Sequence, residues 1–215
     1  MRTLLNRWLG QAWFKPALFL LCLLPAIWLV VGAATDHLGA NPAEALLRAT
    51  GDWTLRFVLI TLAVTPLRKI TGWGWLLRLR RMLGLYAFFY GMVHLSSYVS
   101  FDHVFEAGEI IKDIIKRPFI TVGFATLLLM LPLAVTSTNA MVRRLGARRW
   151  IALHRLIYII GPLGVLHFWW MVKKDLTEPV IYALVLALLL GYRLVMRLRE
   201  SRKPARTAAP TAVKT

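Results

Sequence analysis

The chain has 215 residues, of which 58% are hydrophobic and 17% charged, with a mean hydropathy of +0.60 and a net charge of +17. A soluble globular domain is closer to half apolar and a quarter charged, so this composition is typical of a membrane protein rather than of a soluble nucleic-acid-binding domain. Its single cysteine, Cys22, excludes an intrachain disulfide, cysteine-based zinc and iron–sulfur sites, and the C-x-x-C-H attachment of c-type heme.

Apolar segments long enough to cross a bilayer follow one another along the chain, since a span needs about 20 largely apolar residues. The first covers about residues 16–34, behind Arg2, Arg7 and Lys15. It is longer than the apolar core of a secretory signal peptide, so we predict an uncleaved first span. Further spans are expected at about residues 53–67, 82–99, 119–135, 150–172 and 179–196.

Six such spans with short loops predict an all-α integral membrane protein, a bundle of six transmembrane helices over residues 1–198. Residues 199–215 are basic and rich in Ala, Thr and Pro. This composition is typical of disorder, so we expect a basic disordered tail. Cys22 lies within the first span, where we expect it to pack as a small hydrophobic side chain.

The positive charge is divided unevenly between the two sides of the membrane that alternating loops define. Residues 1–16, 68–81, 136–150 and 193–215 share one side and carry nineteen Lys or Arg against one acid. The other side carries seven Lys or Arg against nine acids. Cytoplasmic loops are enriched in Lys and Arg, so we expect both termini in the cytoplasm. Because the basic segments adjoin spans, they favour anionic lipid head groups over nucleic acid as partners.

The five histidines fall into two groups. His37 and His103 lie in loops on the acidic side, where we expect solvated side chains. His94, His154 and His167 lie within the predicted third and fifth spans, where an ionisable side chain is costly and tends to be functional. A hydrogen bond between helices explains one such histidine. Three of them on two helices favour axial ligands of heme.

Each of these two spans contains the pattern Gly-x-x-His. Gly91 precedes His94, and Gly164 precedes His167, by three residues. Residues three apart lie on one helical face, so each glycine can clear space for a flat porphyrin beside the ligand. Glycine at a helix interface can instead serve close packing, which explains the glycines but not the imidazoles.

Depth in the membrane favours His94 and His167 as the two axial ligands of one heme. At 1.5 Å per residue from the basic ends of their spans, His94 lies about 20 Å in, His167 about 27 Å and His154 about 8 Å. His154 then marks a second position nearer the cytoplasm. One point opposes this interpretation, because an ideal helix puts His154 and His167 on faces roughly 140° apart. Pro162 lies between them and can bend the helix.

Two axial imidazoles leave the iron no open position, so the predicted heme transfers electrons and activates no small ligand. The sequence holds no G-x-S-x-G, H-E-x-x-H, Walker or G-x-G-x-x-G motif that points to another chemistry. The alternative class is a non-redox membrane transporter or assembly factor whose buried histidines move protons. A different cytochrome b, such as a dehydrogenase anchor, is a further alternative.

Motifs in two of the spans carry a resemblance to a known family. Those at the third span are Arg80, Arg81, Leu83, Gly84, Leu85, His94, Tyr98 and Asp102. Those at the fifth span are Arg149, Trp150, Leu153, His154, Arg155, Leu156, Tyr158 and His167. With these residues the chain resembles the MsrQ family, the heme-binding membrane subunits of methionine-sulfoxide reductase systems, within the ferric reductase and NADPH oxidase superfamily.

The resemblance implies a bacterial inner-membrane protein that binds heme b, and FMN, in a six-helix bundle. It implies that His94, His154 and His167 serve heme and that the subunit carries electrons without catalysing a reaction itself. The implied partner is MsrP, a periplasmic molybdopterin reductase that repairs methionine sulfoxide in oxidised proteins. The implied donor is the quinone pool or a cytoplasmic flavin reductase.

The chain departs from the superfamily pattern at one position. The oxidases of the superfamily carry two histidines on each of two helices, whereas the third span here supplies only His94. Arg81 stands about where a second histidine would lie. A second bis-histidine heme is therefore not matched. His154 would use another ligand, or hold a propionate, a quinone or a flavin.

Overall fold

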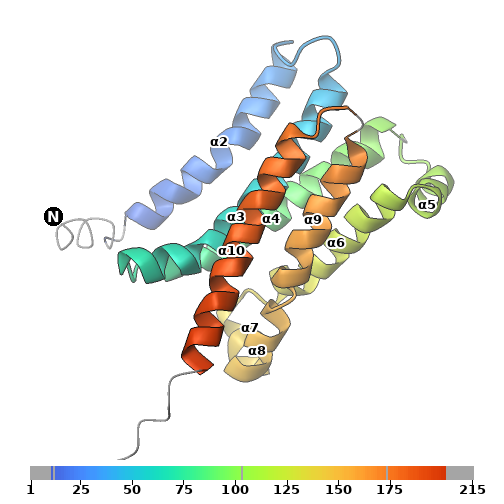
Figure 1. Cartoon of the computed structure of the whole chain (residues 1–215). Helices are drawn as coiled ribbons and strands as arrows, with labels where there is room; N and C mark the ends of the chain where they lie inside the picture. The colour runs from blue at the N-terminus through green and yellow to red at the C-terminus, as the bar shows by residue number, and fades with distance from the viewer. Residues whose placement is uncertain (1–10, 12, 103, 173, 202–215) are drawn as a thin grey trace, which may run out of the picture.

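The computed structural model describes residues 11, 13–102, 104–172 and 174–201, and all regular structure in these residues is helical (Figure 1). The helices of the bundle are α2 Phe14–Ala34, α3 Pro42–Thr71, α4 Leu76–Ser97, α6 Pro118–Val135, α9 Ile157–Met171 and α10 Thr177–Ser201. Shorter segments are the π-helix η1 Tyr98–Asp102, α5 Ala107–Lys116, α7 Asn139–Leu145 and α8 Ala147–His154. The predicted all-α class is confirmed.

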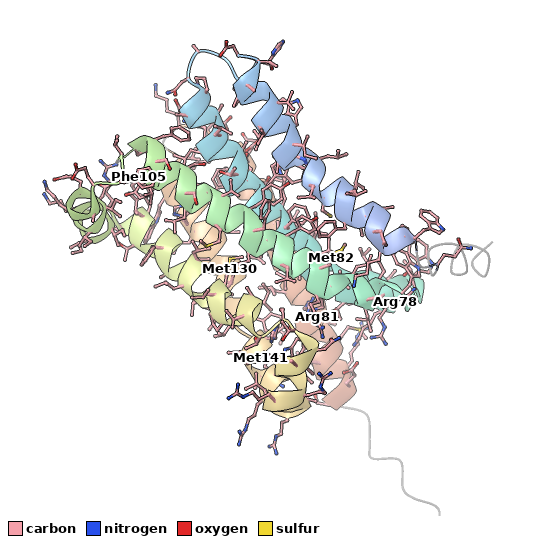
Figure 2. All side chains as sticks on the ribbon, turned by 180° about the vertical axis from the view of Figure 1, so that it is seen from behind. Arg78, Arg81, Met82, Phe105, Met130 and Met141 are labelled. Carbon is pink, nitrogen blue, oxygen red and sulfur yellow. The ribbon has the colours of Figure 1, made fainter. Side chains whose placement is uncertain are left out.

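The centre of the bundle is the hairpin of α3 and α4, which pack against each other along their lengths. Gly72 ends α3 in the left-handed conformation, at φ 77°, where a residue without Cβ is favoured. α2 covers one side of this hairpin, and α6, α9 and α10 cover the other (Figure 1). Phe105 lies at one end of the molecule, and Arg78, Arg81 and Met141 lie toward the other (Figure 2).

Four helical stretches of the described chain are long and apolar enough to cross a membrane: α2, α6, Ala147–Met171 and α10. The first two agree with the predicted spans, and α10 exceeds its prediction at both ends. α3 and α4 are long but less apolar, because they carry residues such as Asp52, Arg56 and Arg80. They nevertheless supply most of the buried core, which makes them the inner helices of the bundle.

Two predicted segments differ in extent from the helices of the structure. The span expected at residues 53–67 lies within a much longer helix, α3, whose N-terminal half carries charged residues such as Glu44, Arg48 and Asp52. α10 continues to Ser201, so residues 199–201 of the expected tail are helical. Residues 202–215 of the expected tail lie outside the described residues. His103, which we expected in a loop, also lies outside the described residues.

The predicted fifth span is not one continuous helix. α8 ends at His154 and α9 begins at Ile157. Across the junction the backbone N–H of Arg155 donates to Ala152 O at 3.2 Å and that of Leu156 to Leu153 O at 3.0 Å. These are i→i−3 bonds, so the chain passes through a tight 3₁₀-like turn before it reaches Pro162. The expected fifth span is therefore interrupted at Arg155 and Leu156, before Pro162, where a bend was expected.

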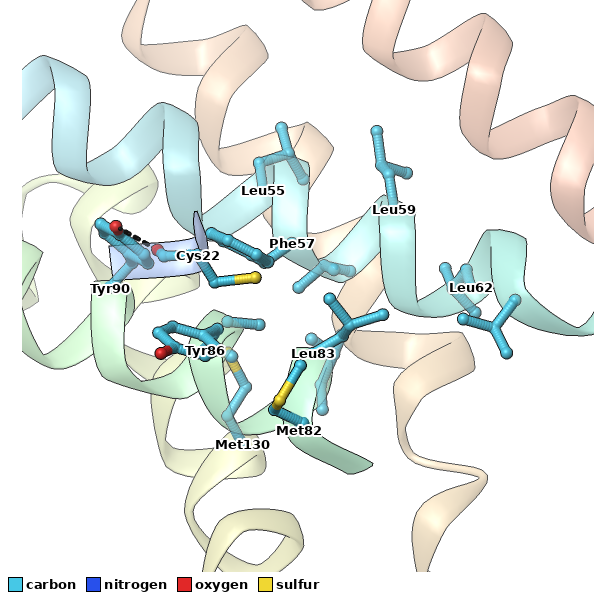
Figure 3. Close-up of a cluster of buried hydrophobic side chains, with 14 of the residues drawn as sticks. Cys22, Leu55, Phe57, Leu59, Leu62, Met82, Leu83, Tyr86, Tyr90 and Met130 are labelled. Carbon is cyan, nitrogen blue, oxygen red and sulfur yellow. Dashed lines mark hydrogen bonds between the residues drawn. The ribbon is translucent and has the colours of Figure 1, made fainter. Parts of the chain in front are cut away.

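A buried aromatic cluster joins α2 to the central hairpin (Figure 3). The Tyr90 hydroxyl donates to Cys22 O at 2.9 Å and accepts from Ala26 N–H at 3.1 Å. Ala26 N–H and Cys22 O are the donor and acceptor that pair in a regular helix, so the hydroxyl bonds both groups of one turn of α2. Phe57 stacks on Tyr90 with ring centroids 5.3 Å apart. Cys22 is buried among these side chains, in agreement with the predicted packing role.

Arg193 joins α10 to α3 and α9. Pro66 of α3 has no N–H, so the carbonyl of Leu62, four residues earlier, lacks its helical partner. The Arg193 guanidinium donates to Leu62 O and, at 2.9 Å, to the Tyr158 hydroxyl. A charged side chain thereby satisfies a backbone group that would otherwise be unpaired within the bundle.

Candidate functional site

His94 of α4 and His167 of α9 face each other inside the bundle. Their ring centroids are 6.3 Å apart, and the ring planes differ by 75°. Both side chains line a cavity of about 780 Å³ between α3, α4, α6 and α9. This volume lies within the roughly 300–1,000 Å³ typical of ligand and cofactor cavities. The structure therefore brings together the two histidines that depth in the membrane had paired.

A backbone carbonyl anchors each of these imidazoles. His94 Nδ1 lies 2.9 Å from Leu47 O of α3, and His167 Nδ1 lies 2.6 Å from Phe119 O of α6. A carbonyl oxygen only accepts, so Nδ1 carries the proton and donates in both cases. The Nε2 atom of each neutral ring is then left with a free lone pair, the arrangement that metal-ligating histidines adopt.

Glycine lies four residues after each anchoring carbonyl. A Cβ at Gly51 would lie 3.1 Å from His94 Cε1, and a Cβ at Gly123 would lie 2.6 Å from His167 Cε1. Residues i and i+4 share a helical face, so a side chain at either position would occupy the place of the imidazole. Sequence analysis missed both glycines. Their signal was a helix-interior glycine, which costs about 1 kcal/mol relative to Ala and often has a packing reason.

The two glycines singled out from the sequence, Gly91 and Gly164, also line the cavity. A Cβ at Gly91 would lie 3.0 Å from Leu127 Cδ1, and one at Gly164 would lie 3.4 Å from Leu55 Cδ1. Both glycines therefore border the cavity and also permit close contact with a side chain of a neighbouring helix. The porphyrin-clearance and packing interpretations are compatible at these positions.

The walls of the cavity are mainly apolar, whereas its rim is charged. Apolar lining residues come from several helices: Leu55, Val58, Leu127, Met130, Ile160 and Phe168. Charged residues at the rim are Glu44, Arg48, Asp52, Arg117, Lys174 and Asp175. The backbone N–H of Thr177 donates to Asp175 at 2.9 Å, and hydrogen bonding by Thr177 lowers the pKa of that carboxyl. An apolar interior with a polar rim suits a flat, largely apolar cofactor with charged edges.

His154 lies in a separate, smaller cavity of about 270 Å³. Its ring stacks on Trp150, with centroids 3.8 Å apart, and its Nδ1 donates to Trp150 O at 3.1 Å. Its Nε2 is buried and lacks a hydrogen-bond partner among the described residues. Arg80 and Arg81 of α4 line the same cavity. Val58 and Met130 line both cavities, so the two lie next to each other in the bundle.

The turn between α8 and α9 bears on the angular problem posed by His154 and His167. An ideal helix leaves these two side chains on faces far apart. A 3₁₀ turn rotates the chain by about 120° per residue rather than 100°, which moves the faces toward each other. The turn lies at Arg155 and Leu156, and both histidines line interior cavities.

Other histidines and acids form no comparable centre in the described part of the chain. No group of three or more His, Cys, Asp or Glu side chains there is arranged to hold a metal ion. His37 is exposed, and its Nδ1 lies 2.8 Å from Thr35 Oγ1. A metal bound by His94 and His167 would therefore need further ligands that these side chains do not supply. The four nitrogens of a porphyrin would provide them.

Comparison with known proteins identifies similar chains. Residues 50–165 match the family described as "Ferric reductase like transmembrane component". The "Protein-methionine-sulfoxide reductase heme-binding subunit MsrQ" of Azospira oryzae is 55% identical over 200 residues, 93% of this chain and 86% of the relative. The protein of the same name from Polaromonas naphthalenivorans is 52% identical over 210 residues, 97% of this chain and 96% of the relative. No solved structure matches the chain.

Proposed function

Because the chain belongs to the MsrQ family of heme-binding subunits of protein-methionine-sulfoxide reductase, we propose that it binds heme b between His94 and His167 and passes electrons to the periplasmic reductase MsrP. MsrP, a molybdopterin protein, would use these electrons to repair methionine sulfoxide in oxidised periplasmic proteins. The chain itself would act as an electron-transfer subunit without a catalytic site of its own.

The observation that carries this proposal is the pair of anchored imidazoles. Each has its Nδ1 bonded to a carbonyl, which leaves its Nε2 available to a metal. Two metal–imidazole bonds of about 2 Å would place the two ring centroids roughly 6 Å apart, once the distance from each Nε2 to the centre of its ring is added. The observed separation of 6.3 Å is close to this value.

The residues around the pair would hold and tune the group. Leu47 O and Phe119 O fix the orientation of the rings and increase the basicity of the ligating nitrogens. The apolar walls would keep water away from the site, and with His94 and His167 both holding the group, no place would remain there for a substrate. When bound there, heme b supplies one-electron exchange between ferric and ferrous iron.

We further propose that six helices cross the bacterial inner membrane, with α3 and α4 as spans beside the four more apolar stretches. Both termini would then lie in the cytoplasm, as the distribution of Lys and Arg predicts. His94 and His167 would lie toward the periplasmic side, near the partner that accepts the electrons.

His154 would serve the cytoplasmic half of the electron-transfer path. Its Nε2, which lacks a hydrogen-bond partner among the described residues, and the side chains of Arg80 and Arg81 border the smaller cavity. This combination suits a second heme position, a heme propionate, or the phosphate of FMN. Electrons would enter here from the quinone pool or from a cytoplasmic flavin reductase.

Heme binding is tested with purified His94→Ala and His167→Ala proteins. Each change removes an axial ligand, so we expect one heme signal and the electron transfer to be lost or severely reduced. Heme per protein and the reduced α band provide the measurement, and the exposed His37→Ala serves as control. Full heme content in either variant would refute the assignment. A colourless wild-type protein would favour the alternative in which buried histidines move protons.

The role of His154 is tested separately with His154→Ala. We expect most of the His94–His167 heme signal to remain, because that cavity is distinct, while reduction from the cytoplasmic donor is blocked. Heme content and the rate of reduction by quinol or by a flavin reductase should be measured on the same preparation. Unimpaired reduction would leave His154 with a structural role, and loss of all heme from a folded variant would make it a ligand of the main heme.

A further inference from the structure

The segment that follows α4 leaves the direction of the bundle. After η1, the chain turns at Val104 and Phe105, which have φ values of 45° and 64°, and enters α5. α5 is seen end-on in Figure 1 while α6 is seen from the side, so α5 lies across the bundle rather than along it. Only Arg117 separates its end at Lys116 from the start of α6 at Pro118. α5 is therefore fixed at the end of the bundle where the chain enters α6.

The side chains of α5 divide into three sectors around its axis. With about 100° per residue and Ile111 placed at 0°, Ile115 lies at about +40°. Lys112, Lys116 and Glu109 occupy roughly +100° to +160° by the same count. The remaining sector, from about −160° to −60°, holds Asp113, Ile110 and Ile114. A helix between two environments needs two faces, so three sectors indicate three environments.

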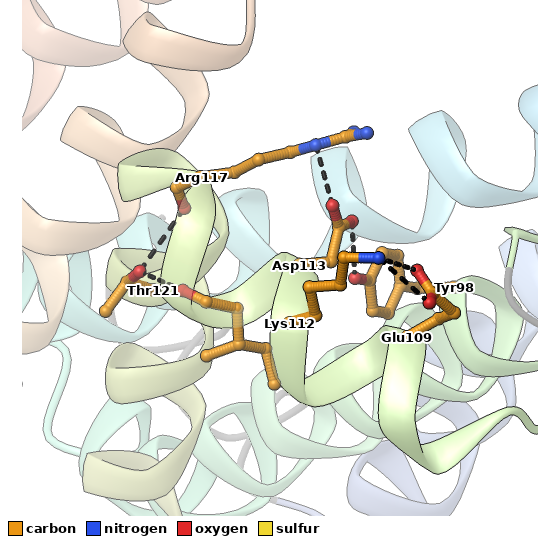
Figure 4. Close-up of polar contacts among 7 residues, drawn as sticks. Tyr98, Glu109, Lys112, Asp113, Arg117 and Thr121 are labelled. Carbon is orange, nitrogen blue, oxygen red and sulfur yellow. Dashed lines mark hydrogen bonds and ion pairs between the residues drawn. The ribbon is translucent and has the colours of Figure 1, made fainter.

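The sector with Asp113 faces the protein (Figure 4). The Tyr98 hydroxyl donates to Asp113 at 2.9 Å, and Arg117 Nε lies 2.7 Å from the same carboxylate. The Thr121 hydroxyl of α6 donates to Ile114 O. Asp113 and Ile114 are partly buried by these contacts. The C-terminal half of α5 is thus attached to η1 and α6, and its rotation about its own axis is fixed.

The sector with Lys112 is polar and exposed. Lys112 and Glu109 form an ion pair at 3.1 Å, with about half of each side chain accessible. Such a pair contributes little to stability and is typical of a face in water. Lys116 lies on the same face and is exposed.

The sector between these two is apolar and uncovered. Ile111 is 59% exposed and Ile115 is 75% exposed. The preceding turn adds Phe101, Val104 and Phe105, which are 52%, 74% and 70% exposed. An apolar surface of this size on one side of a helix is unfavourable in water. Farther along the chain, α6 also exposes apolar side chains, such as those of Leu128 and Leu131.

We propose that α5 lies in the plane of the membrane interface, with Ile111 and Ile115 in the boundary between head groups and acyl chains. The order of the sectors fits this position, because a helix beside the bundle has protein on one side, lipid below and water above. The bilayer is the occupant because only Arg117 separates α5 from α6, a helix that is long and apolar enough to cross a membrane. Arg117, which pairs with Asp113, lines the rim of the His94–His167 cavity, so the anchored helix would hold that rim at a fixed depth.

The position of α5 is tested by spin labelling of the full chain. The buried Cys22 is replaced by Ala, and Ile111→Cys, Ile115→Cys, Lys112→Cys and Lys116→Cys are made singly and labelled. The proteins are reconstituted into phosphatidylethanolamine–phosphatidylglycerol vesicles. Collision of the label with oxygen, which concentrates in lipid, is compared with collision with a water-soluble nickel chelate.

Labels at positions 111 and 115 should collide preferentially with oxygen, and labels at 112 and 116 preferentially with the nickel chelate. A preference for the nickel chelate at all four positions would place α5 in water and overturn the proposal. Weak collision with both reagents at 111 and 115 would also overturn it, because a protein surface, from a second copy or a partner, would then cover the sector. The readout does not depend on heme, so it is independent of the proposed electron transfer.

Discussion

At the level of single residues, one arrangement occurs twice in the site. A carbonyl in α3 or α6 accepts from a histidine Nδ1, and a glycine one turn later makes room for the ring. The carbonyl fixes which ring nitrogen carries the proton, and the glycine sets how closely the imidazole approaches the neighbouring helix. The geometry of the two proposed ligands would therefore depend on residues that neither bind a metal nor carry a charge.

This dependence predicts the effect of a single methyl group. Gly123→Ala would place Cβ 2.6 Å from His167 Cε1, and Gly51→Ala would place it 3.1 Å from His94 Cε1. Overpacking costs about 1–3 kcal/mol, so we expect heme binding to weaken roughly ten- to hundredfold in Gly123→Ala and less in Gly51→Ala. Heme occupancy in purified protein is the measurement.

Gly191→Ala is the matched control, since it is also a glycine within a helix and a Cβ there meets nothing within 4 Å. It should keep the wild-type heme content. Wild-type occupancy in Gly123→Ala as well would show that the ring can move aside without loss of ligation, and the spacing argument would fail.

At the level of helices, proline and arginine act as a pair across α3 and α10. Pro66 leaves Leu62 O without its helical N–H, and Arg193 supplies the missing donor together with a bond to Tyr158. A buried carbonyl without a partner costs about 1–3 kcal/mol. The arginine is thus expected to stabilise the bundle through a backbone atom rather than through an ion pair.

Arg193→Met keeps most of the side-chain volume and removes the donor. We expect a loss of about 1–3 kcal/mol in stability, seen as a lower Tm in detergent. In a Pro66→Ala background the backbone N–H of residue 66 can bond Leu62 O, so the same change should cost less. Arg197→Met is the control, because Arg197 is exposed and its guanidinium lies over the face of Tyr158. Equal costs with and without Pro66 would show that the Leu62 bond contributes little.

At the level of the whole molecule, charge is segregated between the two ends of the bundle. Arg78 and Arg81 lie at the end opposite Phe105 (Figure 2). Because cytoplasmic segments are enriched in Lys and Arg, this end is expected in the cytoplasm and the end with α5 in the periplasm. The site of His94 and His167 would then face the outer half of the membrane.

Reporter fusions test this orientation. Fusions after Asp102 and after Asp175 should show activity of a periplasmic reporter, and a fusion after Arg144 should show activity of a cytoplasmic one. The reverse pattern at any two of these positions would contradict six spans with both termini inside. A cytoplasmic result after Asp102 alone would mean that α3 and α4 do not both cross the membrane.

The sequence by itself determined the helical membrane class, the positions of α2 and α6, and the three histidines of interest. These features are local, because hydropathy and charge are read along one segment without knowledge of its neighbours. It also predicted the family from motifs around His94 and His154, and the comparison with relatives bears the family out.

Only the tertiary structure decided how the histidines are held. The bonds from His94 to Leu47 and from His167 to Phe119 join residues almost fifty positions apart, and Gly51 and Gly123 matter only because those helices pack together. The turn at Arg155 likewise follows from hydrogen-bond geometry that hydropathy does not encode. Which faces meet depends on side chains interlocking across helices, and that is a property of the packed bundle rather than of any single span.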